Sequence, residues 1–302
     1  MNRLRHRQIL VVAAGMCACL IAACSTFVVY AASTGSTESI TLSPVSKRYT
    51  LNTGTTTNDS FTISNTGNVA YNFIVYARPY AIINSDYNNP NYGAKANGVA
   101  NADAYQWVKF PVTTYHLNPG ESATVPYSLA VPSSAAPGGH YGVIFAETQA
   151  SGGNASIARD KRVGMVVYAT VNGTYKMGAT IGKPTIPFFQ LEPPLSAAIN
   201  VQNTGNADFL ADIQYRVTDI FGNQKYVAKN TYEVLPATTR AIGLQWGAAP
   251  AFGLFKVQII STALNKVSNN TAYVFMAPYW FYGFVAIVIV GGVMYALVRR
   301  RR

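Results

Sequence analysis

The chain has 302 residues, a formal net charge of +11 and only three cysteines. The charge does not indicate a nucleic-acid-binding protein, because seven of the 23 Lys and Arg residues lie at the two chain ends and the other 16 form no basic block. Cys17, Cys19 and Cys24 all lie near the N-terminus, which excludes disulfide bonds from the rest of the chain and leaves its fold dependent on apolar cores.

Residues 1–32 have the pattern of a signal peptide, which predicts that the protein is exported. Three arginines, Arg3, Arg5 and Arg7, precede an apolar run over residues 9–21. Small residues near Ala31 fit ordinary cleavage, whereas residues 21–25 resemble a lipobox in which Cys24 is acylated. Cleavage near Ala31, lipidation of Cys24 and an uncleaved N-terminal anchor all remain open.

One pattern occurs twice in the body of the chain. Residues 61–77 and residues 198–217 each contain an Asn-Thr-Gly-Asn stretch followed by apolar residues at alternate positions. Alternation places one face of a strand on a core, and Asn and Gly tolerate the positive φ of a tight turn. Each copy is therefore a strand, a turn and a strand, with Asn65 and Asn203 at matching places.

The correspondence continues downstream, where Pro119 and Gly138 match Pro236 and Gly253. Short strands between Gly and Pro turns, without long helical periodicity, predict an all-β fold of two tandem immunoglobulin-like antiparallel β-sandwiches. We expect the first domain at residues 39–172, the second at residues 175–275, and a short stiff hinge between them.

The first domain carries an insertion that the second lacks. It falls around residues 82–107 and is rich in Asn, Tyr and Gly. Long loops on a rigid sandwich are often functional, and Tyr and Asn make contacts of the kind that paratopes use. The segment is predicted to be a ligand- or partner-binding loop that can be deleted over residues 84–104 without loss of the fold, with an inert or partly helical decoration as the alternative. The candidate binding residues are Asp86, Tyr87, Asn88, Asn91, Tyr92, Tyr105 and Trp107.

The sequence contains few residues suited to catalysis. His116 and His140 flank strands or turns, and Glu121 and Glu147 occupy positions typical of solvated carboxylates. The oxygens around Asp86 lack the second carboxylate that a calcium loop needs. No nucleophile elbow, phosphate loop or zinc spacing is present in the sequence. We therefore predict no catalytic, metal-binding or cofactor-binding residue, and a protein that is not an enzyme.

Residues 279–298 predict one transmembrane helix. They carry no charge, and 20 helical residues span about 30 Å, the thickness of the hydrocarbon core of a bilayer. Tyr279, Trp280 and Tyr282 suit one membrane interface, and the arginines of residues 299–302, beginning with Arg299 and Arg300, suit the cytoplasmic one. The lipid bilayer is thus a predicted partner, with the body of the protein outside the cell and residues 299–302 as a cytoplasmic tail.

This layout resembles the WxL-interacting surface proteins of Gram-positive bacteria. The local likeness rests on residues 76–78 with the Asn-rich segment after them, on residues 117–121 (Leu-Asn-Pro-Gly-Glu) and on residues 137–144 (Pro-Gly-Gly-His-Tyr-Gly-Val-Ile). The resemblance implies a non-enzymatic binder in the cell envelope that contacts peptidoglycan or another surface protein through its first domain. The alternative is a membrane-tethered pilus-type chaperone or surface-assembly factor that acts by strand complementation, with residues 163–171 as the candidate acceptor edge.

Overall fold

The computed structural model describes residues 38–99, 102–149 and 161–300. The part of the chain from Glu38 onward forms one compact unit. The predicted signal peptide, Cys24, Arg301 and Arg302 lie outside the described residues.

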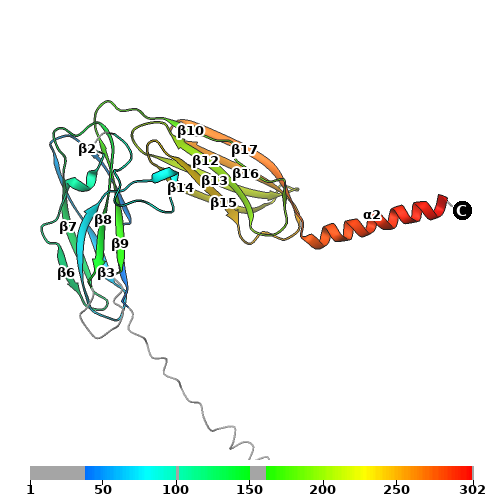
Figure 1. Ribbon diagram of the computed structural model, residues 1–302, viewed down its shortest axis with the longest axis horizontal. Coiled ribbons are helices and arrows are strands. Elements are labelled where there is room, and N and C mark those ends of the chain that lie inside the picture. The colour runs from blue at the N-terminus through cyan, green and yellow to red at the C-terminus, as the bar shows by residue number, and fades with distance from the viewer. Residues whose placement is uncertain (1–37, 100–101, 150–160, 301–302) are drawn as a thin grey trace, which may run out of the picture. The chain divides into compact units, whose positions relative to one another are not determined.

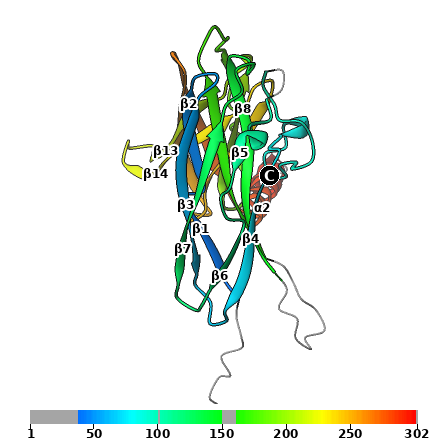
Figure 2. The ribbon, with the colours of Figure 1, turned by 90° about the vertical axis from the view of Figure 1, so that its left-hand side faces the viewer.

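The first nine strands form two sheets that face each other (Figures 1 and 2). One sheet has the order β1-β3-β7-β5 and the other the order β2-β9-β8-β4-β6. The strands are β1 (Ile40–Ser43), β2 (Ser46–Leu51), β3 (Thr56–Asn65), β4 (Tyr71–Arg78), β5 (Val108–Lys109), β6 (Thr114–Leu117), β7 (Ser122–Ala130), β8 (Gly138–Thr148) and β9 (Arg162–Val171). Two 3₁₀ turns, η1 (Ile83–Ser85) and η2 (Ala104–Trp107), lie in the insertion between β4 and β5.

The next eight strands form a second sandwich of the same kind. Its sheets have the orders β10-β12-β15 and β11-β17-β16-β13-β14. The strands are β10 (Ala179–Ile181), β11 (Phe189–Gln190), β12 (Leu195–Asn203), β13 (Phe209–Asp219), β14 (Gln224–Val234), β15 (Thr239–Trp246), β16 (Gly253–Ala263) and β17 (Lys266–Met276). The prediction of an all-β fold with two tandem immunoglobulin-like sandwiches is confirmed.

Alternation explains why each sandwich has its own core. On β13 the predicted inward residues, from Phe209 to Val217 at every second position, are all buried, and the residues between them face outward. Apolar side chains from both sheets of a sandwich meet in this way, and burial of apolar surface contributes about 25 cal/mol per Å². Two separate apolar clusters result, one in each sandwich.

Each sandwich contains a buried asparagine, and the two asparagines make equivalent hydrogen bonds. The Asn65 amide donates to the carbonyl oxygens of Val69 and Leu117 at 2.8 and 3.3 Å and accepts the Gly67 N–H at 3.0 Å. Asn203 repeats this set: it donates to Ala207 and Val234 at 2.9 and 2.8 Å and accepts the Gly205 N–H at 2.8 Å. Both side chains are almost fully buried, so the internal repeat inferred from the sequence is confirmed.

One strand pair in each sandwich departs from the antiparallel pairing of the rest. β2 runs parallel to β9, and β11 runs parallel to β17. In both sandwiches the first two strands belong to different sheets. β1 and β10 join one sheet, and β2 and β11 join the other. Side-chain alternation defines the faces of a strand but not its neighbours, which is why this pairing was not predicted.

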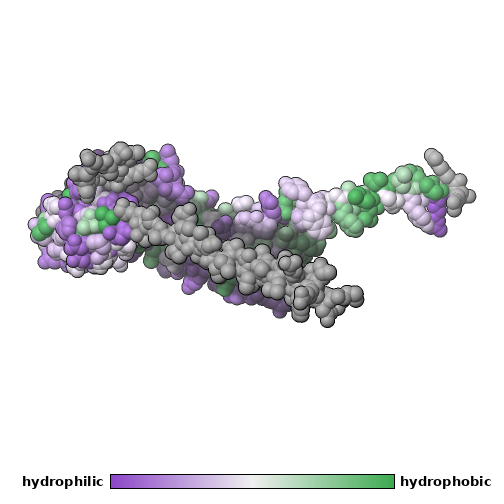
Figure 3. Space-filling view, turned by 90° about the horizontal axis from the view of Figure 1, so that it is seen from below, coloured by the Kyte–Doolittle hydropathy of each residue, from purple (hydrophilic) through white to green (hydrophobic). Residues whose placement is uncertain are grey.

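Helix α2 (Tyr279–Arg300) is 22 residues long and apolar enough to cross a membrane. It begins at the predicted residue and extends two residues further, through Arg300, than residues 279–298. None of its residues is buried by the rest of the chain, and Figure 3 shows apolar surface along it. Only Ala277 and Pro278 separate it from β17.

We expect Asn203→Ala to lower the free energy of unfolding of the second sandwich by about 3 kcal/mol, because it leaves two buried carbonyls and one N–H without a partner. Urea unfolding followed by circular dichroism measures the change. Asn200→Ala, an exposed amide on the same strand, is the control and is expected to change stability by less than about 0.5 kcal/mol. Equal losses in the two variants would contradict the role of the buried amide.

Candidate functional site in an uncovered sheet edge

The insertion is packed against the first sandwich instead of standing free. Tyr80 and Ile82 are buried against Tyr141, Phe145 and Tyr168, which lie on the outer face of the β8–β9 pair. The backbone of the insertion also contributes, since the carbonyl of Ala102 accepts the Tyr141 N–H at 2.7 Å. The expectation that residues 84–104 can be deleted without loss of the fold stays a prediction; Tyr87, Tyr92 and Ala96 of that range pack against the aromatic cluster, which argues against it.

The structure separates the seven candidate residues of the insertion into two groups. Trp107 is buried in the core of the first sandwich, Tyr87 is half-buried, and Tyr92 packs edge-to-face on Phe145 with ring centroids 4.9 Å apart. Tyr105 is half-buried beside Gly142. These four aromatic side chains serve packing.

Asp86, Asn88 and Asn91 are exposed. Their hydrogen bonds are local: Asp86 accepts from Asn88 and Asn89, and Asn91 accepts from Gly93 and Ala94. The bond from Asn89 lowers the pKa of the Asp86 carboxyl. These residues shape turns, and a binding role for them stays a prediction.

Part of the insertion contacts the second sandwich. The Tyr87 hydroxyl accepts the Leu235 N–H at 2.8 Å and bonds to the Thr238 hydroxyl at 2.5 Å. The Ser85 hydroxyl accepts the Thr239 N–H at 2.9 Å. The guanidinium of Arg240 lies 4.4 Å from the centroid of the Tyr87 ring, close enough for a cation–π interaction. The insertion thus connects the two sandwiches through side-chain contacts.

A polar network around the buried residues Tyr141 and Asp208 adds to this contact. The Tyr141 hydroxyl donates to the Asp208 carboxylate and accepts the Asp208 N–H, both at 2.9 Å. Arg48 forms ion pairs with Asp208 and with Glu233. Burial raises the pKa of the Tyr141 phenol well above its usual value, which keeps it protonated as a donor. Sequence reasoning missed this network, because no local pattern marks a charged residue that will be buried.

The strand predicted to accept a partner is not an open edge. β9 pairs with β8 on one side and with β2 on the other, where Ser46 to Leu51 lie opposite Val166 to Val171. Only the first residues of β9, before Val166, extend beyond β2. The prediction that residues 163–171 provide the acceptor edge is therefore wrong.

The second sandwich has an uncovered edge at β15. β15 pairs with β12, and no strand among the described residues pairs with its other side. Its counterpart in the first sandwich is β7, because the N–H groups of Asn65 and Asn203 donate to the residues that precede β7 and β15, Glu121 and Thr238, both at 2.9 Å. β7 is covered at its far end by β5, which pairs with Ser128 and Leu129.

The chemistry of the two edges also differs. β7 contains Pro126, opposite Ser60 on β3, and proline has no N–H to offer to a further strand. The corresponding residue on β15 is Gly243, opposite Ala198 on β12. The exposed residues of β15, Ala241, Gly243 and Gln245, carry no charge. Natural edge strands are usually protected by charges, proline or a covering segment, so β15 has the features of an edge that accepts another strand.

A groove runs along this edge, between β15 and the edge strand β14 of the opposite sheet. Tyr226 and Tyr232 of β14 and Leu244 and Gln245 of β15 line it. Tyr226 is stacked on Trp246 with ring centroids 5.9 Å apart and an angle of 10° between the rings. At the corresponding position of the first sandwich, Trp107 and Val108 fill the core beside β7. The groove is thus open where the first sandwich supplies its own residues, and its lining combines aromatic rings with polar groups.

The residues considered for catalysis remain separate from one another. Glu121 accepts hydrogen bonds from Asn118, which lower the pKa of its carboxyl, and Glu147 accepts one from Tyr76. His140 is buried with its ring 4.6 Å from Trp107, and His116 bonds to Asn72 at 2.8 Å. Among the described residues no three His, Cys, Asp or Glu side chains come together as a metal site would require.

No protein-family model matches the sequence, and no curated protein matches it. Among solved structures the chain is similar to the class 5 fimbriae chaperone CfaA, with 10% identity and a TM-score of 0.38 over 78% of this chain and 99% of that one. It is similar to the E. coli chaperone DraB, with 9% identity and a TM-score of 0.37 over 78% and 98%. It is also similar to a chain of the CsuC–CsuE chaperone-tip adhesion subunit pre-assembly complex of Acinetobacter baumannii, with 10% identity and a TM-score of 0.36 over 72% and 92%. At such low identities and TM-scores these similarities assign no function.

We expect Tyr141→Phe to destabilise the protein by about 2 to 3 kcal/mol, because it removes the hydroxyl that both donates to and accepts from Asp208 inside the buried network. Urea unfolding measures the loss. Tyr105→Phe removes a hydroxyl that has only a 3.5 Å contact with Gln106 and is the control, with an expected change near zero. A Tyr141→Phe variant as stable as the control would show that the network does not hold the sandwiches together.

Proposed function

We propose that the protein is a membrane-anchored, non-enzymatic binding protein of the cell surface, and that its second sandwich holds an extended segment of another surface protein by adding a strand to β15. The observation that carries the proposal is the uncovered edge of β15, whose exposed residues carry no charge, beside a groove lined by aromatic and polar side chains. Strand addition uses main-chain hydrogen bonds for affinity and side-chain pockets for specificity, and β15 offers both.

The first sandwich indicates what the partner segment looks like. β5 runs antiparallel to β7, with Val108 buried in the core and Lys109 exposed. A segment placed likewise on β15 runs antiparallel to it and alternates apolar and polar side chains. Its apolar side chains pack over Tyr226 and Leu244 in the groove.

The residues at the two ends of α2 support a location of this site outside the cell. Arg299 and Arg300 at the end of α2 favour a cytoplasmic C-terminus, and Tyr279, Trp280 and Tyr282 at its start favour the outer interface. A partner held by β15 is then retained close to the membrane. This role is that of a surface-assembly factor that acts by strand complementation, with the acceptor edge in the second sandwich and not in the first.

The resemblance to WxL-interacting proteins motivates one further proposal. Asp86, Asn88 and Asn91 are the exposed polar residues of the insertion, and contact between them and peptidoglycan remains a prediction.

A photo-crosslinking amino acid at Gln245 tests strand addition in living cells. We expect a protein adduct of defined mass at position 245, because its side chain is exposed on the edge strand, and none at Gln214, which lies on the central strand β13. Mass spectrometry of the adduct is expected to identify a segment with alternating apolar residues.

Gly243→Pro is the discriminating variant. Pro126 occupies the matching position of β7, so the fold is expected to tolerate proline there, while the lost N–H weakens strand addition and lowers the adduct yield at position 245 at least tenfold. An adduct that persists at full yield in a folded Gly243→Pro protein, or equal adducts at positions 245 and 214, would contradict the proposal.

A further inference from the structure

One end of the second sandwich is held next to the membrane by the covalent chain. Gly253 lies opposite Met276 and Asp219 lies opposite Phe255, so the β13–β14 turn, the β15–β16 turn and the end of β17 share this end. From Met276 the chain reaches Tyr279, the first residue of α2, in three steps, or about 10 Å. The outer surface of the bilayer therefore lies within reach of these turns.

This end exposes large apolar side chains. Phe221 is 83% exposed, and others from three different segments are between 40% and 58% exposed: Phe188, Phe189, Ile220, Phe252 and Leu254. We call these six residues the apolar end. Transfer of this apolar surface from water into an apolar environment, such as a bilayer, is favourable.

Aromatic contacts connect the apolar end to the start of α2. The ring of Phe252 lies 5.0 Å from that of Phe281, measured between centroids, and the ring of Phe275 lies 5.9 Å from the same ring. Phe189 in turn lies 6.0 Å from Phe275. The apolar surface is thus continuous with the membrane-spanning helix, and Figure 3 shows apolar surface where the helix adjoins the sandwich.

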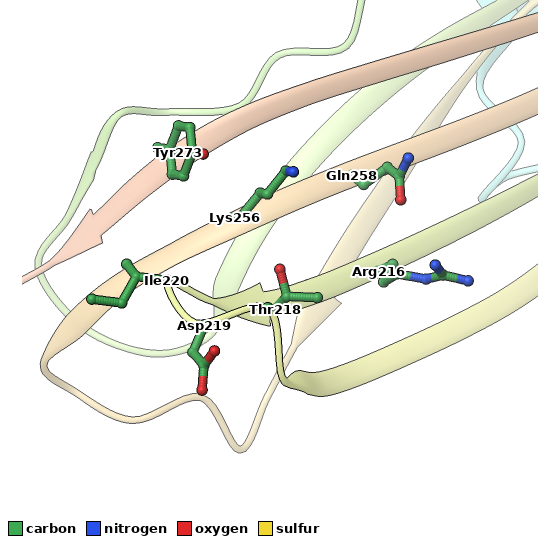
Figure 4. A pocket seen from close by; sticks show the side chains of 8 residues that line it. Arg216, Thr218, Asp219, Ile220, Lys256, Gln258 and Tyr273 are labelled. Carbon is green, nitrogen blue, oxygen red and sulfur yellow. The ribbon is translucent and has the colours of Figure 1, made fainter.

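Basic side chains lie behind the apolar end, on the outer face of the sheet. Figure 4 shows Arg216 and Lys256 in a shallow pocket with Gln258 and Tyr273. The Arg216 Nε is buried and has no hydrogen-bond partner among the described residues. Asp219, the acidic residue at the pocket, is already engaged by Asn223 and by Lys225, whose Nζ lies 3.2 Å from its carboxylate. Asp219 is thus paired with Lys225 and not with Arg216 or Lys256, which leaves the charges of these two side chains for an external anion.

We propose that this end of the second sandwich is itself a lipid-binding surface: the apolar end inserts between the headgroups of the outer leaflet, and Arg216 and Lys256 bind lipid phosphates. The arrangement follows the depth profile of an interface, with Phe and Ile deepest, then Tyr273 and its cross-strand neighbour Lys256, and Arg216, opposite Gln258, farther along the sheet. This inference is independent of strand addition at β15. It assigns a second membrane contact to the protein besides α2, one that restricts tilting of the second sandwich.

The test uses the full-length protein in nanodiscs of phosphatidylcholine and phosphatidylglycerol, with the photo-crosslinker benzoylphenylalanine replacing Phe221. Val267, 69% exposed, lies next to the β16–β17 turn at the other end of the same sandwich and is the matched control. We expect a lipid adduct, detected by mass spectrometry, at position 221 and at least tenfold less at position 267. Phe189 is a second probe position, so the test does not depend on one variant.

The phosphate contact is tested separately by Arg216→Gln combined with Lys256→Gln. We expect phosphatidylglycerol to be enriched over phosphatidylcholine among the adducts at position 221, and this enrichment to fall severalfold in the double variant. Lipid adducts that are equally frequent at positions 221 and 267, or absent at both 221 and 189, would overturn the proposal. Unchanged lipid selectivity in the double variant would remove the cations from it.

Discussion

The fold depends on two buried asparagine side chains, one in each sandwich, that make equivalent hydrogen bonds. Asn65 and Asn203 each connect the end of a strand, the turn that follows and a more distant segment through three hydrogen bonds. A buried amide is stabilising only when its donors and acceptor are all satisfied, which fixes the surrounding backbone in one arrangement. Because the same constraint closes both sandwiches, the two can be compared position by position, and the differences between them become informative.

Two such differences bear on function. The first sandwich has an insertion and a covering strand, β5, whereas the second has neither. The insertion supplies Trp107 to the first core, Tyr80 and Ile82 to the outer face of β8 and β9, and Tyr87 to the contact with the second sandwich. The surface of the first sandwich is thus partly used for internal contacts. The second sandwich leaves the edge of β15 uncovered among the described residues and presents an apolar end beside α2.

The sequence was sufficient for the features that depend on local periodicity. Alternation at Phe209 to Val217 predicted β13, the repeated Asn-Thr-Gly-Asn predicted equivalent turns, and an uncharged run of 20 residues predicted α2 from Tyr279. It was insufficient where distant segments meet. Tyr87 and Trp107 look like exposed binding aromatics in a loop, but one bonds to Leu235 and the other enters a core. β9 is not an open edge, because β2 pairs with it in parallel, and the sequence did not predict this pairing. The sequence also did not show that Pro126 and Gly243 occupy equivalent positions, because this depends on the equivalence of β7 and β15 in the structure.

The central claim, that β15 is an edge open to a partner strand, is tested most directly by hydrogen–deuterium exchange on the full-length protein. We expect the amides of Ala241 to Trp246 to include rapidly exchanging groups in the isolated protein. We expect these amides to become protected, while those of β13 are unchanged, when the protein is recovered bound to its surface partner. Slow exchange throughout β15 in the isolated protein, or no added protection in the bound one, would contradict this claim.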